Sequence, residues 1–323
     1  MRVLIKGAGV VGLTLAHELI GHGVEVVIAE RQPGFGGAAS WFAGGMLAPW
    51  CERESAEETV LTRGIGAIDW WDRTLPGEVS RNGTLVVAPP RDAGELKRFA
   101  SRTSGFEWLD GEAIARLEPA LAGRFREALF FPGEAHLDPR RAIALLRQKL
   151  VEHGATFIDE ADSNGDSDLI ADCSGASRIG TIAGLRGVRG EMLYLQTGEV
   201  ELSRPVRLIH PRIPLYIVPR GNGLFMCGAT MVETDDGGPI TARSLMELLN
   251  AAYALHPAFG EARLLETGTG VRPAFANNLP RIIRAGNTIT LNGLYRHGFL
   301  LSPALAEEAA GIALARNLKG DAA

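Results

Sequence analysis

The first 30 residues carry the pattern that most restricts what this chain can fold into. An apolar run at residues 3–5 leads into the segment GAGVVG, a helix-like stretch follows, and a second apolar run ends at Glu30, 18 residues after Gly12. Strand, glycine turn, helix, strand and acid in this order are typical of the first unit of a Rossmann-type sheet. The sequence therefore predicts a parallel sheet that binds a dinucleotide.

Each part of the pattern has a physical role. Gly7 permits a tight turn, Gly9 lets the backbone approach a pyrophosphate, and Gly12 lets the helix pack closely on the strand. The N–H groups that open the helix, at Val10 and Val11, would attract the anion. Glu30 would accept a hydrogen bond from a ribose hydroxyl and repel a 2'-phosphate, which disfavours NADP and leaves NAD and FAD open.

Composition and charge exclude several other classes of protein. The chain has 323 residues and a net charge of -5, and no long run of one sign predicts a nucleic-acid-binding face. The three cysteines and seven histidines show no disulfide or metal spacing. The N-terminus lacks the layout of a secretory signal, and no uninterrupted apolar run approaches about 18 residues. We expect a cytoplasmic protein with no metal, membrane or nucleic-acid partner.

The segment after Glu30 bears on the choice of cofactor. Residues 36–50, GGAASWFAGGMLAPW, are too rich in small side chains for an ordinary surface helix. Their glycines would let the backbone lie against a flat ring system.

Four motifs resemble the D-amino acid oxidase family of FAD-dependent oxidoreductases. Glu30-Arg31 followed by ASWFAGGML is similar to its flavin-binding N-terminus, and the best match is the glycine oxidase branch, which is associated with thiamine biosynthesis. YIVPRGNGLFMCGATM, GVRPAFANNLPRI and GLYRHGFLLSPALAE resemble later blocks of glycine oxidases in the same order. The resemblance covers nearly the whole chain.

The resemblance implies an α/β fold in which a Rossmann-like FAD-binding domain carries a second, α+β substrate domain built on an antiparallel sheet. The expected FAD-binding domain is discontinuous, with residues 1–80, 133–186 and 276–323. The expected substrate-binding domain comprises residues 81–132 and 187–275.

The resemblance also implies the site residues. Arg272 would pair with a substrate carboxylate through its two-pronged guanidinium, and Tyr216, Met231 and Arg296 would line the rest of the substrate cavity. Non-covalent FAD would contact the following residues: Gly7, Gly9, Val10, Val11, Gly12, Glu30, Arg31, Ala39, Ser40, Gly44, Gly45, Met46, Gly175, Leu294, Tyr295, Arg296, His297, Gly298, Phe299 and Leu300.

The last motif predicts a helix that starts at the flavin. Ser302 is a good N-cap and Pro303 a good first helical residue, so the positive end of the helix dipole would face the negative charge of reduced flavin. Three features depart from the family. Residues 162–165 replace a small β-meander, Asn277-Asn278 replaces a common Asp-Gly, and His297 follows the arginine where asparagine is common.

The function implied by the resemblance is the FAD-dependent oxidation of glycine or a small amine to an imine, with O2 reduced to H2O2. The imine would supply thiazole synthesis in thiamine biosynthesis. Two alternatives stay open at this point: a D-amino acid or sarcosine oxidase or dehydrogenase of the same family, and a non-catalytic FAD-binding protein. A homo-oligomer is also possible, and the sequence does not identify the preferred amine.

Overall fold

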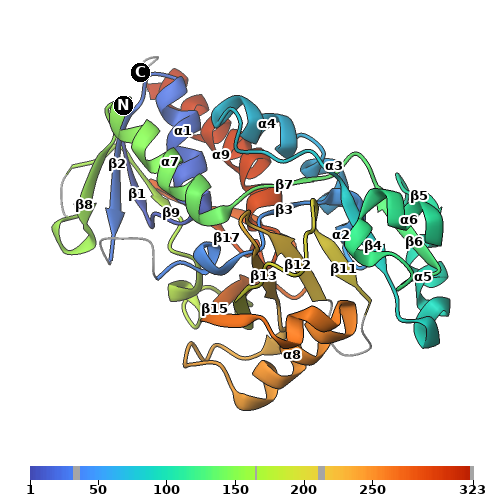
Figure 1. The fold of residues 1–323 in the computed structure, drawn as a ribbon. Helices are drawn as coiled ribbons and strands as arrows, with labels where there is room; N and C mark the ends of the chain where they lie inside the picture. The colour runs from blue at the N-terminus through green and yellow to red at the C-terminus, as the bar shows by residue number, and fades with distance from the viewer. Residues whose placement is uncertain (32–36, 164–165, 210–214, 321–323) are drawn as a thin grey trace.

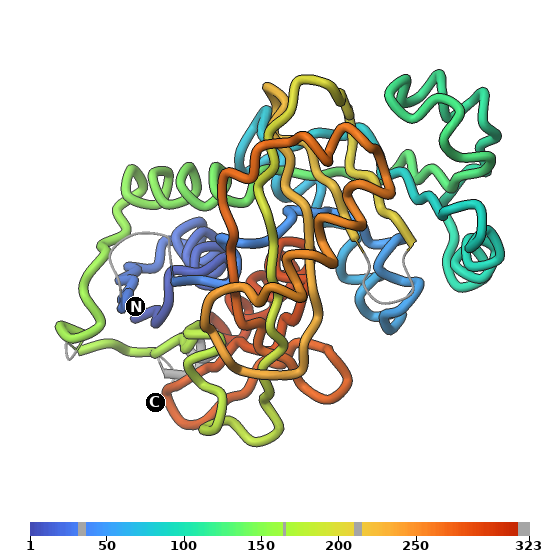
Figure 2. Tube along the Cα trace, turned by 60° about the horizontal axis from the view of Figure 1, so that its bottom comes forward, coloured from blue at the N-terminus to red at the C-terminus, as the bar shows by residue number. Residues whose placement is uncertain are grey.

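The computed structural model describes residues 1–31, 37–163, 166–209 and 215–320, the last five of these as backbone only. Two large sheets organise the chain (Figure 1). The N-terminus lies on the side of the first sheet in Figure 1, and residues 90–125 lie at the opposite end of the molecule in Figures 1 and 2.

The first sheet is the predicted Rossmann-type sheet. Its strands lie in the order β16-β17-β9-β1-β2-β8, all parallel except the edge strand β16. From β1, the chain adds β2 on one side and β9 on the other, so the strand order reverses beside β1. The strands are β1 (Arg2–Lys6), β2 (Glu25–Glu30), β8 (Thr156–Asp159), β9 (Leu169–Asp172), β16 (Arg281–Ala285) and β17 (Thr288–Asn292).

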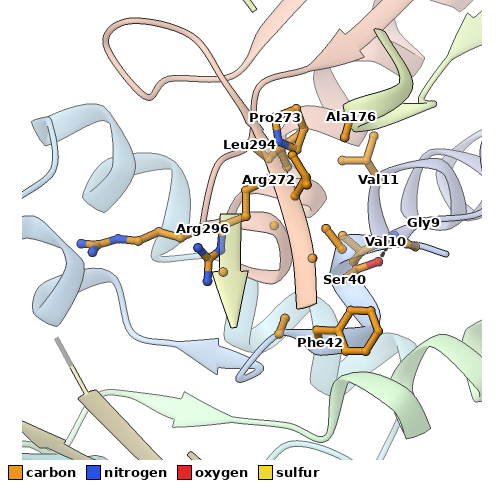
Figure 3. Close-up of a pocket in the computed structure, with 18 of the residues that line it drawn as sticks. Gly9, Val10, Val11, Ser40, Phe42, Ala176, Arg272, Pro273, Leu294 and Arg296 are labelled. Carbon is orange, nitrogen blue, oxygen red and sulfur yellow. Dashed lines mark hydrogen bonds between the residues drawn. The ribbon is translucent and has the colours of Figure 1, made fainter. Parts of the chain in front are cut away.

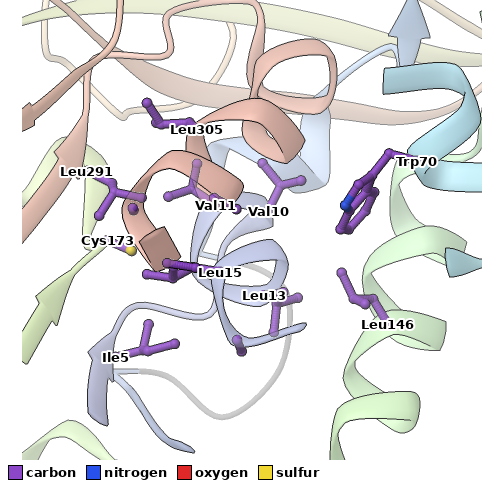
Figure 4. Close-up of a cluster of buried hydrophobic side chains, with 14 of the residues drawn as sticks. Ile5, Val10, Val11, Leu13, Leu15, Trp70, Leu146, Cys173, Leu291 and Leu305 are labelled. Atoms are coloured by element: carbon purple, nitrogen blue, oxygen red, sulfur yellow. The ribbon is translucent and has the colours of Figure 1, made fainter. Parts of the chain in front are cut away.

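Helices cover this sheet and complete its core. The helix α1 (Val10–Gly21) packs against α9 (Gly298–Gly320) and α7 (Pro139–Glu152), and α4 (Ala67–Thr74) packs against α9. Figure 4 shows their apolar side chains meeting those of β1 and β17. The sequence DPRRAIALLRQKLVEHG, which starts at Asp138, predicts a helix capped by that residue. The cap of α7 is confirmed, because the Asp138 carboxylate accepts hydrogen bonds from the Arg140 and Arg141 amides.

The second sheet lies beside the first and has nine strands. The expectation of an antiparallel sheet is correct except at one place: β4 and β11 pair in parallel. The strands are β4 (Thr84–Val87), β5 (Glu107–Asp110), β6 (Glu127–Phe131), β10 (Arg186–Gln196), β11 (Val206–Leu208), β12 (Leu215–Pro219), β13 (Leu224–Gly228), β14 (Val232–Glu233) and β15 (Arg263–Ala274).

The remaining elements cover or link the sheets. The helix α8 (Ala242–Leu255) packs on the second sheet at β10, β12 and β13. The sequence YIVPRGNGLFMCGATM predicts two strands joined by a Gly-Asn-Gly turn. This hairpin is present, since β12 and β13 pair across the turn at residues 220–223. The other elements are β3 (Met46–Leu47), β7 (Ala135–His136), α2 (Pro49–Arg53), α3 (Glu58–Gly64), α5 (Ala93–Ala100) and α6 (Gly111–Leu117).

The start of α9 differs from the sequence prediction. The helix begins at Gly298, so Ser302 is a buried interior residue and not an N-cap, and Pro303 lies inside the helix. Proline has no N–H and leaves the carbonyl four residues earlier without its helical donor. That carbonyl belongs to Phe299, and the indole Nε1 of buried Trp71 donates to it at 2.9 Å. A tertiary hydrogen bond therefore replaces the missing helical one.

Within the described residues, α9 is also the one helix whose length and composition would allow it to cross a membrane. More than half of that stretch is buried, largely against α1. Packing in the core therefore accounts for its apolar character.

A buried carboxyl group anchors α2. Glu134 is 1% exposed, and its Oε1 accepts a hydrogen bond from the Cys51 amide at 2.7 Å. Its Oε2 has no hydrogen-bond partner among the residues that the structure describes. Burial raises the pKa of Glu134 to about 7, so this group is mainly neutral below that pH.

The bond to Phe299 predicts a coupling between two distant residues. Trp71→Phe should destabilise the protein by about 2–4 kcal/mol, because it removes a buried donor and some core volume. Pro303→Ala restores a backbone N–H for the same carbonyl, so Trp71→Phe should cost about 1 kcal/mol less in that background. Urea unfolding of the four proteins measures the coupling, and strictly additive effects would contradict the assignment.

The Glu134 carboxyl group predicts a pH dependence of stability. The pKa of Glu134 is about 7 in the folded protein and 4.5 in the unfolded chain. Its contribution to the free energy of unfolding is therefore complete below pH 4.5 and is lost as pH rises through 7. The free energy of unfolding should fall by roughly 2–4 kcal/mol over this range. Glu134→Gln keeps an acceptor for Cys51 without titrating, so its profile should be flatter. Parallel pH profiles for the two proteins would refute the prediction.

Candidate active site

A cavity of about 740 Å³ lies where the order of strands reverses in the first sheet. It runs from the carboxyl ends of β1 and β9 to the side chains of β12 and β15 in the second sheet, and Figure 3 shows part of its wall. Every residue that the sequence predicts for the site lines this cavity except Gly12. Ligands of doubly wound sheets bind at this topological position.

Gly12 has a packing role instead. A Cβ atom on Gly12 would lie 1.9 Å from the Gly7 carbonyl oxygen, and one on Gly7 would lie 2.7 Å from the Cys173 carbonyl oxygen. Gly7 also has a φ of +102°, which L side chains rarely adopt. These two glycines bring the start of α1 against the ends of β1 and β9.

Two helix N-termini meet at the cavity. Gly9 is the N-cap of α1 and forms no side-chain hydrogen bond there. Gly298, the first residue of α9, lies next to Val10, because a Cβ atom on Gly298 would be 3.4 Å from Val10 Cγ1. The Val10 amide donates to the Ser40 hydroxyl at 3.3 Å. Because the first N–H groups of a helix lack partners within it, both ends favour a bound anion.

The predicted ribose-binding acid lies at the far end of the cavity. Glu30 is 8% exposed, and its two carboxylate oxygens accept hydrogen bonds of 2.8 and 2.6 Å from Arg147. Arg147 itself lies over the Phe157 ring at 3.8 Å. A carboxylate has about four acceptor positions, so Glu30 keeps capacity for a ribose hydroxyl. Arg31 next to it pairs with Glu160.

The small residues at 37–46 allow close approach of backbone. Gly45 has a φ of +70°, and a Cβ atom there would lie 2.1 Å from the Leu137 carbonyl oxygen. The short helix at Ala39–Phe42 lies on β15, where a Cβ atom on Gly268 or Gly270 would meet the Phe42 ring. Glycines on both sides therefore form this part of the wall.

Arg272 projects from β15 into the cavity (Figure 3). Its guanidinium lies directly over Gly190 of β10, where a Cβ atom would approach Nη2 to 2.0 Å. Nη1 donates to the Thr230 carbonyl at 3.0 Å, and none of the carboxylates in the described part of the chain forms an ion pair with it. Burial lowers the pKa of Arg272 to about 10, against smaller opposing effects that include the Glu52 carboxylate. Within residues 1–31, 37–163, 166–209 and 215–315, Arg272 is therefore a charged group without an ion-pair partner.

Glu52 of α2 is the centre of a charged network on the same cavity. Its Oε2 lies 2.7 Å from Arg296 Nε and 3.3 Å from His297 Nδ1, and its Oε1 accepts from the Tyr216 hydroxyl at 3.1 Å. Arg207 donates to that hydroxyl at 3.0 Å. Burial alone would raise the pKa of Glu52, but the charges of Arg296 and Arg207, and that of His297 when it is protonated, outweigh it and hold the pKa at about 2. Glu52 therefore stays ionised.

Arg296 is already bound by protein groups. Besides the ion pair with Glu52, its Nη2 donates to the Ser55 hydroxyl at 2.8 Å and its Nη1 to the Met231 sulfur at 3.6 Å. In Figure 3 its guanidinium points away from Arg272. Together with Met231 and Tyr295, it separates the cavity from an outer one of about 1280 Å³. Arg296 therefore forms a wall, and substrate could bind it only by displacing these partners.

The departures from the family motifs also have structural explanations. His297 is 3% exposed, and burial lowers its pKa to about 4, so it is neutral beside Glu52 near pH 7. Asn278 adopts a φ of +56° in a turn, which asparagine tolerates better than most residues. The predicted departure at 162–165 falls partly outside the described residues.

Sequence reasoning missed four residues that shape this site: Glu52, Gly190, Arg207 and Thr230. Thr230 lies within the segment YIVPRGNGLFMCGATM, where no role was predicted for it, and the other three belong to no motif with a recognisable spacing. Glu52 and Tyr216 are 164 residues apart, and Arg207 reaches the Cys51 carbonyl across 156 residues. The one available signal was the position of Glu52, six residues after Met46 at the end of the glycine-rich segment.

Comparisons with known proteins agree with this geometry. A thiamine biosynthesis oxidoreductase ThiO of Rhizobium etli, itself a provisional assignment, is 65% identical over 96% of this chain and 95% of its own. The glycine oxidase of Geobacillus kaustophilus is 28% identical over 93% of this chain and 89% of its own. Its crystal structure aligns with a TM-score of 0.81 at 23% identity, covering 97% and 94% of the two chains.

A third relative has a different substrate in its name. The crystal structure of iminodiacetate oxidase from Chelativorans sp. BNC1 aligns with a TM-score of 0.80 at 26% identity, over 97% of this chain and 95% of the other. The sequence model of the DAO family, described as FAD dependent oxidoreductase, matches residues 2–312. This match covers nearly the whole chain, and the chain therefore belongs to the DAO family of FAD-dependent oxidoreductases.

Proposed function

We propose that this protein oxidises glycine, or a small amine with one carboxylate, to the corresponding imine, with O2 as electron acceptor. The observation that carries the proposal is the unpaired Arg272 guanidinium in the cavity. Among the described residues this cation has no carboxylate partner, so it provides binding energy for a carboxylate of the substrate. The relatives named as ThiO and glycine oxidase support the same substrate class.

The residues present fit FAD. Gly9 has no side chain where a pyrophosphate would approach, Gly7 lets the start of α1 reach this place, and two helix N-termini face it. When bound, FAD supplies a two-electron acceptor that O2 reoxidises, giving H2O2. The predicted contacts would divide between the nucleotide half, from Gly7 to Glu30 and Gly175, and the ring half, from Ala39 to Met46 and 294–300. The three cysteines of the chain are buried free thiols, which agrees with non-covalent binding.

The protein contributes binding and orientation. Arg272, fixed over Gly190 and tied to the Thr230 carbonyl, would hold the substrate carboxylate at one end of the cavity. Tyr216 and Met231 would line the space around the rest of the molecule. The wall of Met231, Tyr295 and Arg296 would restrict water. Positioning of this kind supplies a large part of the rate when the cofactor carries the chemistry.

The cellular role proposed here is the supply of imine for thiazole synthesis in thiamine formation, in the cytoplasm. Three bifunctional ThiO/ThiG proteins, of Synechocystis, Nostoc and Trichormus variabilis, match this chain over about half of their length, which supports a link between the two activities. The domain division at residues 80, 132, 186 and 275 remains a proposal that agrees with the separation of the two sheets. A sarcosine or D-amino acid oxidase is the second candidate, supported by the iminodiacetate oxidase neighbour.

Anaerobic spectroscopy of the purified holoprotein tests the function. Glycine should bleach the flavin absorbance, and air should restore it with release of one H2O2 for each turnover. Preferential bleaching by sarcosine or D-alanine would favour the second candidate. A flavin that no amine reduces would refute both.

The position of Arg272 over Gly190 predicts an effect of one methyl group. Gly190→Ala should displace the guanidinium and raise the apparent KM for the amino acid about 10- to 100-fold, corresponding to loss of a charge-assisted hydrogen bond. Folding and FAD content should be retained, because the clash is with the end of a flexible side chain. Steady-state kinetics measures the change.

Two controls identify the cause. Gly198→Ala adds its methyl group where no atom lies within 4 Å and should leave KM unchanged. In an Arg272→Ala background, Gly190→Ala should have little further effect, since both act on one interaction. A full additional loss in the double variant would contradict the assignment of Arg272.

A further inference from the structure

The orientation of the Tyr216 hydroxyl limits what it can bind. A phenol has one proton to donate and two lone pairs that accept. Burial raises the pKa of Tyr216 well above its usual value, so the proton stays on the oxygen. That proton points to Glu52 Oε1, and one lone pair accepts from Arg207. The hydroxyl can therefore accept one more hydrogen bond but cannot donate to a substrate carboxylate without leaving Glu52.

The Glu52 carboxylate has acceptor capacity of its own on the cavity wall. It is 7% exposed and ionised, and it lines the same cavity as Arg272. Oε1 carries the hydrogen bond from Tyr216, and Oε2 lies beside Arg296 and His297 but accepts no aligned hydrogen bond. Oε2 is also fully buried, whereas each carboxylate oxygen has about two acceptor positions, so Oε1 keeps one position for an N–H donor.

The remaining cation of this wall does not compete for the substrate carboxylate. Arg296 is held by Glu52 and Ser55, and its guanidinium points away from Arg272 (Figure 3). The cavity thus has an unpaired positive group at Arg272 and two acceptors at Glu52 and Tyr216. An α-amino acid has the complementary arrangement, a carboxylate and an N–H donor one carbon apart.

We propose that Glu52 and the Tyr216 oxygen together recognise the amino group of the substrate, while Arg272 alone holds its carboxylate. This inference rests on the proposed amine substrate and assigns the acceptors for it. Arg207 is then a positioning residue, because its hydrogen bond fixes the direction of the Tyr216 hydroxyl. The arrangement would select amino acids over carboxylates that lack a donor.

Glycine and acetate separate the two ends of the site. Acetate has the carboxylate without the amino group, so its Kd, from the flavin spectral shift of the holoenzyme, reports Arg272. The Kd for glycine comes from saturation of the anaerobic flavin reduction rate. Glu52→Gln should raise the Kd for glycine about ten-fold or more, as expected for loss of a charged acceptor. The Kd for acetate should stay within two-fold of the wild-type value, or fall, because Arg296 loses its counterion in this variant.

A merely structural role of Glu52 would give a different result. If it serves only to hold Arg296, both ligands should weaken by similar factors, and this outcome overturns the proposal. An unchanged Kd for glycine also overturns it. Glu57→Gln is the matched control, since Glu57 is five residues away and lines the outer cavity only; it should not change the ratio of the two Kd values.

Tyr216→Phe tests the direction of the hydrogen bond without changing a charge, and it serves if Glu52→Gln does not fold. It should raise the Kd for glycine about 3- to 10-fold and leave the Kd for acetate unchanged. Equal weakening of acetate would show that the hydroxyl donates to the carboxylate and would refute the assignment. A wild-type holoenzyme that binds acetate but no amine would refute the proposed function as well, whereas glycine oxidation with equal losses in the variants would refute this inference alone.

Discussion

The close contact between α1 and the ends of β1 and β9 is the constraint on which the rest of this structure depends. With side chains as small as methyl at Gly7 or Gly12, the chain could not bring these three elements together. Their contact sets the direction of α1, and α9 packs along α1 with its own first residue beside Val10. Both helices therefore start at the same point in space, and the nucleotide cavity exists because they do.

The two charged groups at the substrate end of the cavity, Glu52 and Arg272, differ in how the protein compensates their charge. The Glu52 carboxylate has protein partners on both oxygens, and its neighbours keep it ionised in spite of burial. Arg272 has a carbonyl oxygen and no ion-pair partner in the part of the chain that the structure describes. A buried cation without a counterion costs folding free energy. Stability is reduced at the place where a bound anion would restore it.

The sequence predicted the parts of the fold that depend on local patterns. The β1–α1–β2 unit, the α7 cap at Asp138 and the β12–β13 hairpin follow from spacings within about 30 residues. The prediction that α9 starts at Ser302 was wrong, because Ser302 and Pro303 are residue types that favour the start of a helix. The proline is tolerated inside the helix only because Trp71, more than 200 residues earlier, donates to Phe299. Family resemblance supplied Arg272, whereas Glu52, Arg207 and Gly190 act through contacts that no local pattern records.

The strand β15 has a mechanical consequence for the site. Gly268 and Gly270 on one face of the strand receive the segment around Phe42, and Arg272 follows on the same face two residues later. Residues two apart on a strand are separated by about 6.6 Å of covalently fixed backbone. The backbone of this strand thus fixes the distance between the wall that would contact the flavin and the cation that would hold the substrate. Thermal motion of β15 would carry both together, so their separation is preserved even when the sheet as a whole moves.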